Sequence, residues 1–434
     1  MIKYKEQRNK KTLVILTVVL LSLYAVVTPM QTFCATNSIY ELQDNLNATV
    51  IEELKEIDFT QFQDIINEFN SKDTNIFSID NIKSKVYSII SGDNAVSYES
   101  FFASVFSGII EVVLKYLPML SLIIAVGVIS NLLNGIKSKF NEKSTGNLIN
   151  LVCFLSVAVL IIGIISKISS TTGHAIENMV KQMNVLFPIL LTLMVGLGAN
   201  ASVGVFQPIV AILSTYIADF FNFFILPLFM LSFVFDIISN LSDNVKLDKF
   251  SSFISSLFKW SIGLIFTIFF AVFSLQGISA GSFDSLSIRT TKYTIKSYIP
   301  VMGGYLSDGM DLILSSTMLI KNSVGLVGVL MLISTIITPI LEIIVFSLLL
   351  KLVSAVLQPM GNSKISNFLS GTSKSITILS STIIAISFMY LISIGLIMTT
   401  ANVVVWYVKV YFKYFGHYRC RSFYRYNCTK WKDK

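Results

Sequence analysis

The chain has 434 residues, of which 53% are hydrophobic and 13% are charged, and its formal net charge is +8. Because the apolar residues gather in long runs, this composition excludes an ordinary soluble globular protein and indicates a polytopic membrane protein. The two histidines and four cysteines show no metal-ligand or disulfide spacing. No Walker A, H-E-x-x-H or G-x-S-x-G pattern occurs, so we expect no cofactor, no metal and no enzymatic activity.

The N-terminus has the layout of a secretory signal peptide, which we place at residues 1–35. Five basic residues precede an apolar run from Leu13 to Val27, and a polar stretch follows that ends near Ala35. This order of charged, apolar and polar segments is typical of a signal sequence that is removed on export. Phe33 is large for a position so close to a cleavage site, so an uncleaved membrane anchor is the alternative.

Residues 36–105 form an acidic segment with helical periodicity. The segment holds twelve Asp and Glu against four Lys, which gives a net charge of −8. Apolar residues recur at helical spacing between the carboxylates, for example at Phe62, Ile65, Ile66 and Phe69. Since a signal peptide precedes this segment, we expect a small helical region outside the cytoplasm.

Between residues 106 and 405, seven apolar segments are long enough to cross a bilayer core of ~30 Å, which takes ~20 helical residues. They lie near residues 112–134, 148–168, 185–203, 209–238, 258–278, 323–350 and 376–405. Asp219 and Pro227 interrupt the fourth segment, which is therefore either one kinked helix or a re-entrant piece followed by a span. The predicted fold class is all-α, a polytopic helical membrane bundle of about seven spans.

Basic residues in short loops give little information on the orientation of seven spans. With an external N-terminal region, the cations expected inside are Lys137, Lys139, Lys143, Arg289, Lys292, Lys296 and Lys321. Those expected outside are Lys181, Lys246, Lys249, Lys351, Lys364 and Lys374. The basic and aromatic C-terminal tail, residues 406–434, favours an inside C-terminus.

Asp219 and Glu342 are candidates for polar groups within the membrane. A charged side chain near the middle of a bilayer costs roughly 3 kcal/mol on insertion scales, so it normally faces a partner or a cavity. Both residues would suit a proton-coupled step. The segments that begin at Leu117 and Leu226 also share a Leu-Pro opening and an Ile-Ser-Asn-Leu close, like internal repeats of transporters. For Asp219, a re-entrant turn near water is the alternative.

Gly277 and Gly281 follow the fifth apolar segment in a G-x-x-x-G pattern and are flanked by small residues. Such residues allow two helix backbones to approach closely. We predict a helix contact at this position.

Arg289, Lys292 and Lys296 recur at i, i+3 and i+7, so on a helix they form one basic stripe beside an apolar face. This pattern is typical of a helix that lies on a membrane surface. A patch that docks an acidic partner is the alternative.

After the pair Gly303-Gly304, Asp308 and Asp311 share one face of the next helical segment. We hypothesise that this acidic stripe pairs with the basic stripe across the glycine turn. The result would be a hairpin of two amphipathic helices at the membrane edge.

Several motifs between Gln276 and Gly361 occur together in one known family. They are Gln276-Gly277 after an apolar span, the Arg289-Thr290-x-Lys292 core, Pro300 with Gly303, Asp308, the turn Leu319-x-Lys321-Asn322-Ser323-Val324-Gly325, and Leu357-Gln358-Pro359 followed by Gly361. On these residues the chain resembles the stage III sporulation protein AE family of endospore-forming Firmicutes. The likeness extends less sharply over the rest of the chain to about Asn402, and the tail at 406–434 departs from the family pattern.

The resemblance implies a multi-pass, non-enzymatic subunit of the mother-cell membrane around the engulfed forespore, with its N-terminal region outside the cytoplasm. It implies sister proteins as partners, including a secretion-type ATPase and ring-forming subunits, in contact with the lipid bilayer and not with nucleic acid. Such a complex would act as a channel with features of a secretion apparatus and support late forespore development. The competing interpretation is a stand-alone secondary transporter, although a carrier of small solutes has little need of a long external region.

Overall fold

The computed structural model describes residues 49–70, 81–91, 98–137, 143–241, 247–298, 302–360 and 363–400. The regular structure within these ranges is entirely helical, which confirms the predicted all-α fold class. The predicted signal peptide at 1–35 and the C-terminal tail at 406–434 lie outside the described residues.

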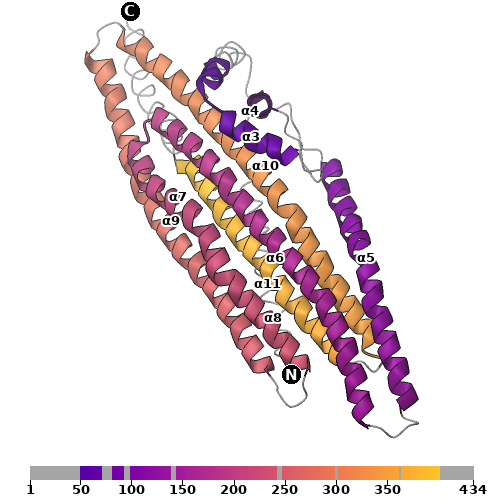
Figure 1. The fold of residues 1–434 in the computed structure, drawn as a ribbon. Coiled ribbons are helices and arrows are strands. Elements are labelled where there is room, and N and C mark those ends of the chain that lie inside the picture. The colour runs from indigo at the N-terminus through magenta and orange to yellow at the C-terminus, as the bar shows by residue number, and fades with distance from the viewer. Residues whose placement is uncertain are drawn as a thin grey trace, which may run out of the picture.

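Six helical runs within the described ranges form an elongated antiparallel bundle (Figure 1). They are α5 (Tyr98–Lys137), α6 (Lys143–Gly196), α7 (Asn200–Phe220) continued by the π-helical turn η2 (Phe221–Ile225) and α8 (Leu226–Leu241), α9 (Asp248–Tyr298), α10 (Gly303–Leu357) and α11 (Ser363–Thr400). Each run is long and apolar enough to cross a membrane. The last residues of α5, α8 and α10 and the first residues of α6, α9 and α11 lie at one end of the bundle, here termed the lower end as in Figure 1. The α6–α7 turn, the end of α9 and the start of α10 lie at the opposite, upper end.

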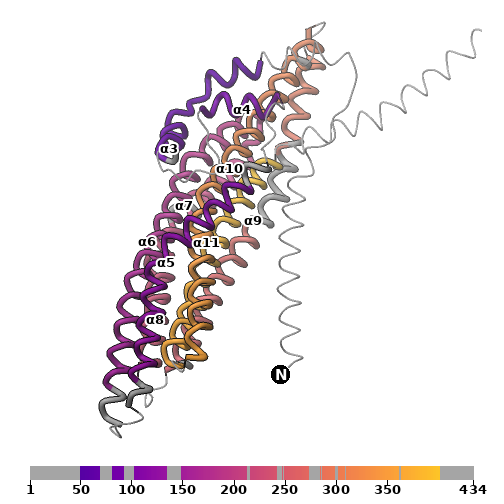
Figure 2. The backbone as a smooth tube through the Cα atoms, turned by 90° about the vertical axis from the view of Figure 1, so that its right-hand side faces the viewer, coloured from indigo at the N-terminus to yellow at the C-terminus, as the bar shows by residue number. Residues whose placement is uncertain are grey.

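A small helical module packs against the upper part of the bundle, beside α10 (Figures 1 and 2). It comprises the helical residues 49–56, α3 (Thr60–Asn70) and α4 (Ile82–Ser91). The Glu53 carboxylate accepts hydrogen bonds from the hydroxyls of Ser316 and Thr317 in α10, at 2.6 and 3.2 Å. The acidic segment is therefore helical where it is described, and it is attached to the bundle. Because α5 begins at Tyr98, the predicted domain boundary after residue 105 falls inside a helix.

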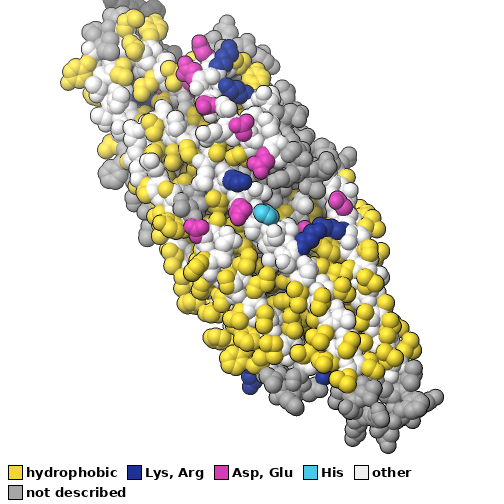
Figure 3. All heavy atoms as spheres, viewed as in Figure 1, with side chains coloured by type: hydrophobic (Ala, Val, Ile, Leu, Met, Phe, Trp, Pro, Cys, Tyr) yellow, Lys and Arg dark blue, Asp and Glu magenta, His cyan; other side chains and the backbone are white. Residues whose placement is uncertain are grey.

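Three helices are far longer than a bilayer requires. α6, α9 and α10 contain 54, 51 and 55 residues, which at ~1.5 Å per residue gives about 75–85 Å. The hydrocarbon core of a bilayer is ~30 Å thick. On the face shown in Figure 3, apolar side chains cover a band over the lower part of the bundle, while charged side chains gather above it. A large part of the bundle therefore projects beyond any bilayer that it crosses.

The number of spanning helices is six among the described residues, where the sequence predicted about seven. The predicted spans 148–168 and 185–203 both lie in the unbroken helix α6, although polar residues separate them in the sequence. α6 then ends in a Schellman motif: Ala199 N–H donates to the Met194 carbonyl at 2.9 Å, and Gly198 N–H to that of Val195 at 2.8 Å. Gly198 has φ +76°, a conformation that glycine adopts without strain.

The fourth predicted span, 209–238, is one continuous helical run and not a re-entrant piece. Asp219 comes just before the π-helical turn, and Pro227 just after it. Proline lacks the N–H that an α-helix needs at that position, and a π-turn is one way in which a helix accommodates the lost hydrogen bond.

The even number of helices changes the predicted distribution of basic residues. Among the described residues, the helix ends at the lower end contain Lys137, Lys143, Lys249, Lys351 and Lys364. Arg289, Lys292 and Lys296 belong to the upper part of α9. The sequence-based assignment of basic residues to the two sides of the membrane was wrong, because it counted α6 as two spans. It placed Lys143 on the same side as Arg289 and on the opposite side from Lys364, whereas Lys143 and Lys364 lie at the same end of the bundle.

Gly303 makes the closest backbone approach in the turn from α9 to α10. A Cβ atom there would lie 2.7 Å from the Ile295 carbonyl oxygen, whereas a Cβ at Gly304 would meet nothing within 4 Å. We therefore expect Gly303→Ala to lower the free energy of unfolding by about 1–3 kcal/mol, the usual cost of overpacking. Gly304→Ala is the matched control and should leave stability nearly unchanged. Thermal unfolding of the purified variants in detergent measures both, and equal midpoints would contradict the prediction.

Candidate functional site

The basic and acidic stripes meet where α9 and α10 run side by side near the upper end. Lys292 Nζ donates a hydrogen bond to Asp311 Oδ1, and the two side chains form an ion pair. Lys292 is largely buried, with 19% of its side chain exposed, whereas Asp311 is 48% exposed. The hypothesised pairing across the glycine turn is therefore present between these two residues.

The other members of the two stripes are not brought into this pair. Arg289 and Lys296 lie on the exposed surface of α9. Their stripe is the last part of one long helix that continues from the apolar segment, and membrane-surface anchoring of this stripe stays a prediction. The side chain of Asp308 and the surroundings of Gly277 and Gly281 lie outside the described residues.

Glu342 forms a charged contact between α5 and α10. Its Oε1 accepts hydrogen bonds from Lys115 Nζ at 2.6 Å and from the Tyr116 hydroxyl at 2.5 Å. The Glu342 side chain is 8% exposed, while that of Lys115 is 39% exposed. The Tyr116 ring also packs against Phe346, with centroids 4.7 Å apart. The carboxylate is thus satisfied by its own protein.

Sequence reasoning missed the partner of Glu342, although the signal was present. Lys115 lies within the first predicted span, 112–134, directly before Tyr116. Only the packing of α5 against α10 brings Lys115 to the carboxylate from a position 227 residues away.

Asp284 is a buried carboxylate that the sequence did not single out. It is 3% exposed, and it accepts hydrogen bonds from the N–H groups of Ala201 and Ser202 at 2.9 and 3.0 Å. The Ser202 hydroxyl donates to it at 2.5 Å. These N–H groups lie in the first turn of α7, where free donors and the helix dipole favour an anion. Asp284 of α9 therefore caps α7 and fixes the turn that contains Gly198.

Lys321 is fully buried in the middle of α10, so the predicted turn at residues 319–325 was wrong. Its Nζ donates to the carbonyls of Ile397 and Met398 at 3.3 and 2.9 Å. These carbonyls belong to the last turn of α11, which has free acceptors and a negative dipole end. A Cβ atom at Gly325 would lie 2.5 Å from Met398 Sδ, so the two helices are also close there.

Hydroxyl contacts join α10 and α11 towards the lower end. Ser347 Oγ lies 2.8 Å from Ser373 Oγ, and Ser354 Oγ lies 3.0 Å from Ser366 Oγ. In addition, Asp236 of α8 accepts hydrogen bonds from the hydroxyls of Ser251 in α9 and Ser375 in α11 at 2.5 and 3.0 Å. Such contacts between apolar helices contribute ~0.6 kcal/mol each on average. They fix the register of α11 against α10 and α8, and that of α9 against α8.

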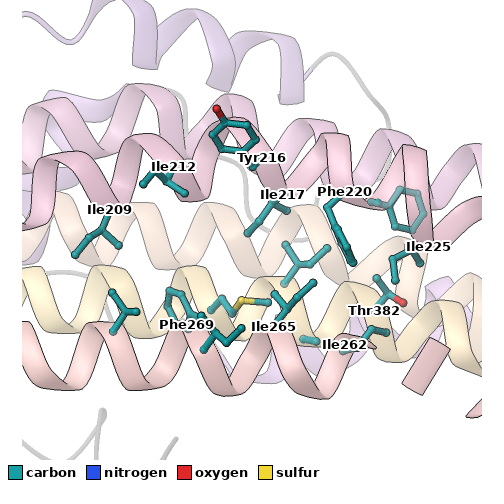
Figure 4. A pocket seen from close by; sticks show the side chains of 16 residues that line it. Ile209, Ile212, Tyr216, Ile217, Phe220, Ile225, Ile262, Ile265, Phe269 and Thr382 are labelled. Atoms are coloured by element: carbon teal, nitrogen blue, oxygen red, sulfur yellow. The ribbon is translucent and has the colours of Figure 1, made fainter. Parts of the chain in front are cut away.

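An apolar groove of about 390 Å³ lies between α7 and α9, with α11 as its floor (Figure 4). Tyr216, Ile217 and Phe220 line it from α7, and Ile265 and Phe269 from α9. None of the sixteen lining residues is charged.

Asp219 lies beside this groove, one helical turn from Tyr216. It is exposed and belongs to an apolar run that could span a membrane. It has no hydrogen bond or ion pair with the described residues. Of the two predicted intramembrane carboxylates, Glu342 is therefore internally paired and Asp219 faces outward.

The family profile and the curated relative that match this chain have the same description. A family profile described as "Stage III sporulation protein AE" matches residues 81–401. The stage III sporulation protein AE of Bacillus subtilis (strain 168) is 25% identical to this chain over 320 residues, which cover 74% of this chain and 80% of that protein. No solved structure matches the chain.

The Lys115 and Glu342 pair allows a double-mutant test. Lys115→Met should lower the free energy of unfolding by about 2 kcal/mol, because it leaves a buried carboxylate with one fewer charged donor. Lys115→Met combined with Glu342→Gln should recover part of that loss, since the uncompensated charge is then absent. Thermal unfolding of the single and double variants in detergent measures the coupling energy. Strictly additive effects would show that the two side chains do not interact.

Proposed function

The chain belongs to the stage III sporulation protein AE family, and from this membership we propose that it is a non-enzymatic subunit of a channel complex with features of a secretion apparatus. The complex would lie in the mother-cell membrane around the forespore and support transport and late forespore development. Its partners would be sister sporulation proteins, including a secretion-type ATPase and ring-forming subunits. That ATPase would provide the energy for transport.

The observation that carries the proposal is the length of α6, α9 and α10. At about 75–85 Å they exceed a ~30 Å bilayer core more than twofold. The upper part of the bundle holds the module of residues 49–70 and 81–91, the Lys292 and Asp311 pair and the cap at Asp284. A rigid helical body outside the bilayer offers a large surface to other proteins, which suits a subunit of an assembly.

The alternative, a stand-alone secondary transporter, receives less support from the polar groups inside the bundle. A proton-coupled carrier needs an ionisable group that faces a polar path. Glu342 is instead held by Lys115 and Tyr116, and the groove between α7 and α9 has an apolar lining. The described carboxylates of the interior, Asp236, Asp284 and Glu342, all join helices to one another.

We propose that the lower end of the bundle faces the cytoplasm. The lysines at the lower end match the excess of Lys and Arg that cytoplasmic loops carry. The module that contains α3 and α4 then lies outside, where the preceding signal-like segment would deliver it. Because six helices return the chain to its starting side, the end of α11 lies outside as well, in contrast to the inside C-terminus expected from the tail.

Labelling of single cysteines tests this orientation. In a variant without its native cysteines, expressed in growing cells that contain no forespore, Asn67→Cys on α3 and Ser297→Cys on α9 should react with a membrane-impermeant maleimide. Lys249→Cys, which is exposed at the lower end, should react only after the membrane is permeabilised. The reverse pattern would overturn the proposed orientation.

Deletion of the coding sequence in its host tests the proposed role. Under sporulation conditions, forespores should complete engulfment and then collapse or stop late transcription, as followed by microscopy and a late reporter gene. The intact gene, restored at another locus, is the control. Normal spores would contradict the role. Solute uptake by the purified chain in liposomes, lost in Asp219→Asn, would favour the transporter.

A further inference from the structure

We propose that the groove between α7 and α9 receives an apolar helix of a partner membrane subunit, and that this helix presents a lysine or arginine to Asp219. The inference rests on the proposed function, since it requires a complex of several membrane proteins. It adds to that function a docking surface and the chemistry of the segment that occupies it.

The groove continues into an exposed apolar surface on both of its walls. On the α7 side, Ile212, Tyr216 and Phe223 are 59%, 61% and 89% exposed. On the α9 side, the lining residues Ile268 and Val272 are 56% and 37% exposed. Helical spacing places Ile212, Tyr216, Asp219 and Phe223 on one side of their helix, at i, i+4, i+7 and i+11. The surface is therefore an apolar strip along two helices with one carboxylate at its edge.

An apolar strip with one carboxylate is unfavourable whether lipid or water covers it. If lipid covers the strip, Asp219 is a charge in an apolar medium without a described partner, which costs roughly 3 kcal/mol at the centre of a bilayer. If water covers the strip, several large apolar side chains stay hydrated together, and such patches mark interaction sites in proteins. A segment that is apolar along its length and basic at one position removes both costs.

The shape of the site favours a helix as the occupant. Two antiparallel helices with a third below them form a trough that runs along their axes, which matches the side-chain ridge of another helix. The cavity of about 390 Å³ has room for more than one bulky side chain of that ridge. The carboxylate beside the trough then selects among apolar helices, because a helix without a cation leaves Asp219 unpaired.

Photo-crosslinking in membranes of sporulating cells tests the site. A photoreactive amino acid replaces Tyr216 on one wall and Ile268 on the other, one position at a time. Val159 on α6, which is 67% exposed, is the control position for an apolar surface outside the groove. Both groove positions should crosslink to the same apolar segment of one identified sister subunit. Crosslinks to phospholipid alone, or to a second copy of this chain, would overturn the proposal.

Charge reversal tests the role of Asp219. Asp219→Lys should reduce co-purification of the crosslinked subunit by about tenfold or more, as expected when a desolvated charge pair is lost. Glu177→Lys, at an exposed carboxylate on α6, is the matched control and should change it by less than about twofold. Reversal of the basic residue in the partner segment should restore co-purification with Asp219→Lys. Undiminished co-purification of Asp219→Lys would show that the carboxylate has no role in docking.

The outcome for the wild-type chain separates the two proposals. If no sister subunit co-purifies with it, the proposed function fails. If sister subunits co-purify but the groove positions crosslink to none of them, the docking surface alone fails.

Discussion

The structure depends on one constraint: a polar group in a bundle of apolar helices needs a partner within the protein. Glu342 meets Lys115 and Tyr116, Asp284 meets the first turn of α7, and Lys321 meets the last turn of α11. Each contact joins residues that are more than 70 positions apart in the sequence. Because an unpaired group would be costly in this setting, each contact also specifies which helix packs against which, and in what register.

α10 and α11 form the centre to which the other helices are attached. The hydroxyl contacts of Ser347 with Ser373 and of Ser354 with Ser366 set the lower part of this pair. Lys321 sets its upper part. Around the pair, the ion pair of Lys115 with Glu342 joins α5 to α10. Asp236 of α8 accepts hydrogen bonds from Ser251 and Ser375, and so connects α8 with α9 and α11. Glu53 joins the N-terminal module to α10. The internal contacts therefore stabilise one arrangement along the length of the bundle.

Asp219 differs from Glu342 and Asp284, and so it bears on function. The other described interior carboxylates join helices within the chain, whereas Asp219 faces outward beside an apolar groove. This contrast connects family membership with mechanism. A subunit of an assembly needs at least one surface that only the complex completes, and the α7 and α9 face has the composition of such a surface. The long projecting helices would then serve as a rigid support for further contacts outside the bilayer.

The sequence by itself determined the membrane class, the helical fold and the family, and it led to the hypothesis that the basic and acidic stripes pair across the α9–α10 turn. It could do so because apolar length, helical periodicity and the short distance across the α9–α10 turn are local properties. Only the tertiary structure decided that residues 143–196 are one helix, because a polar stretch within a helix resembles a loop until its neighbours are known. It also decided that Lys115 reaches Glu342 and that Asp284 caps α7. These contacts join residues 82 to 227 positions apart, and pairing over such distances depends on how helices pack, which no local pattern specifies.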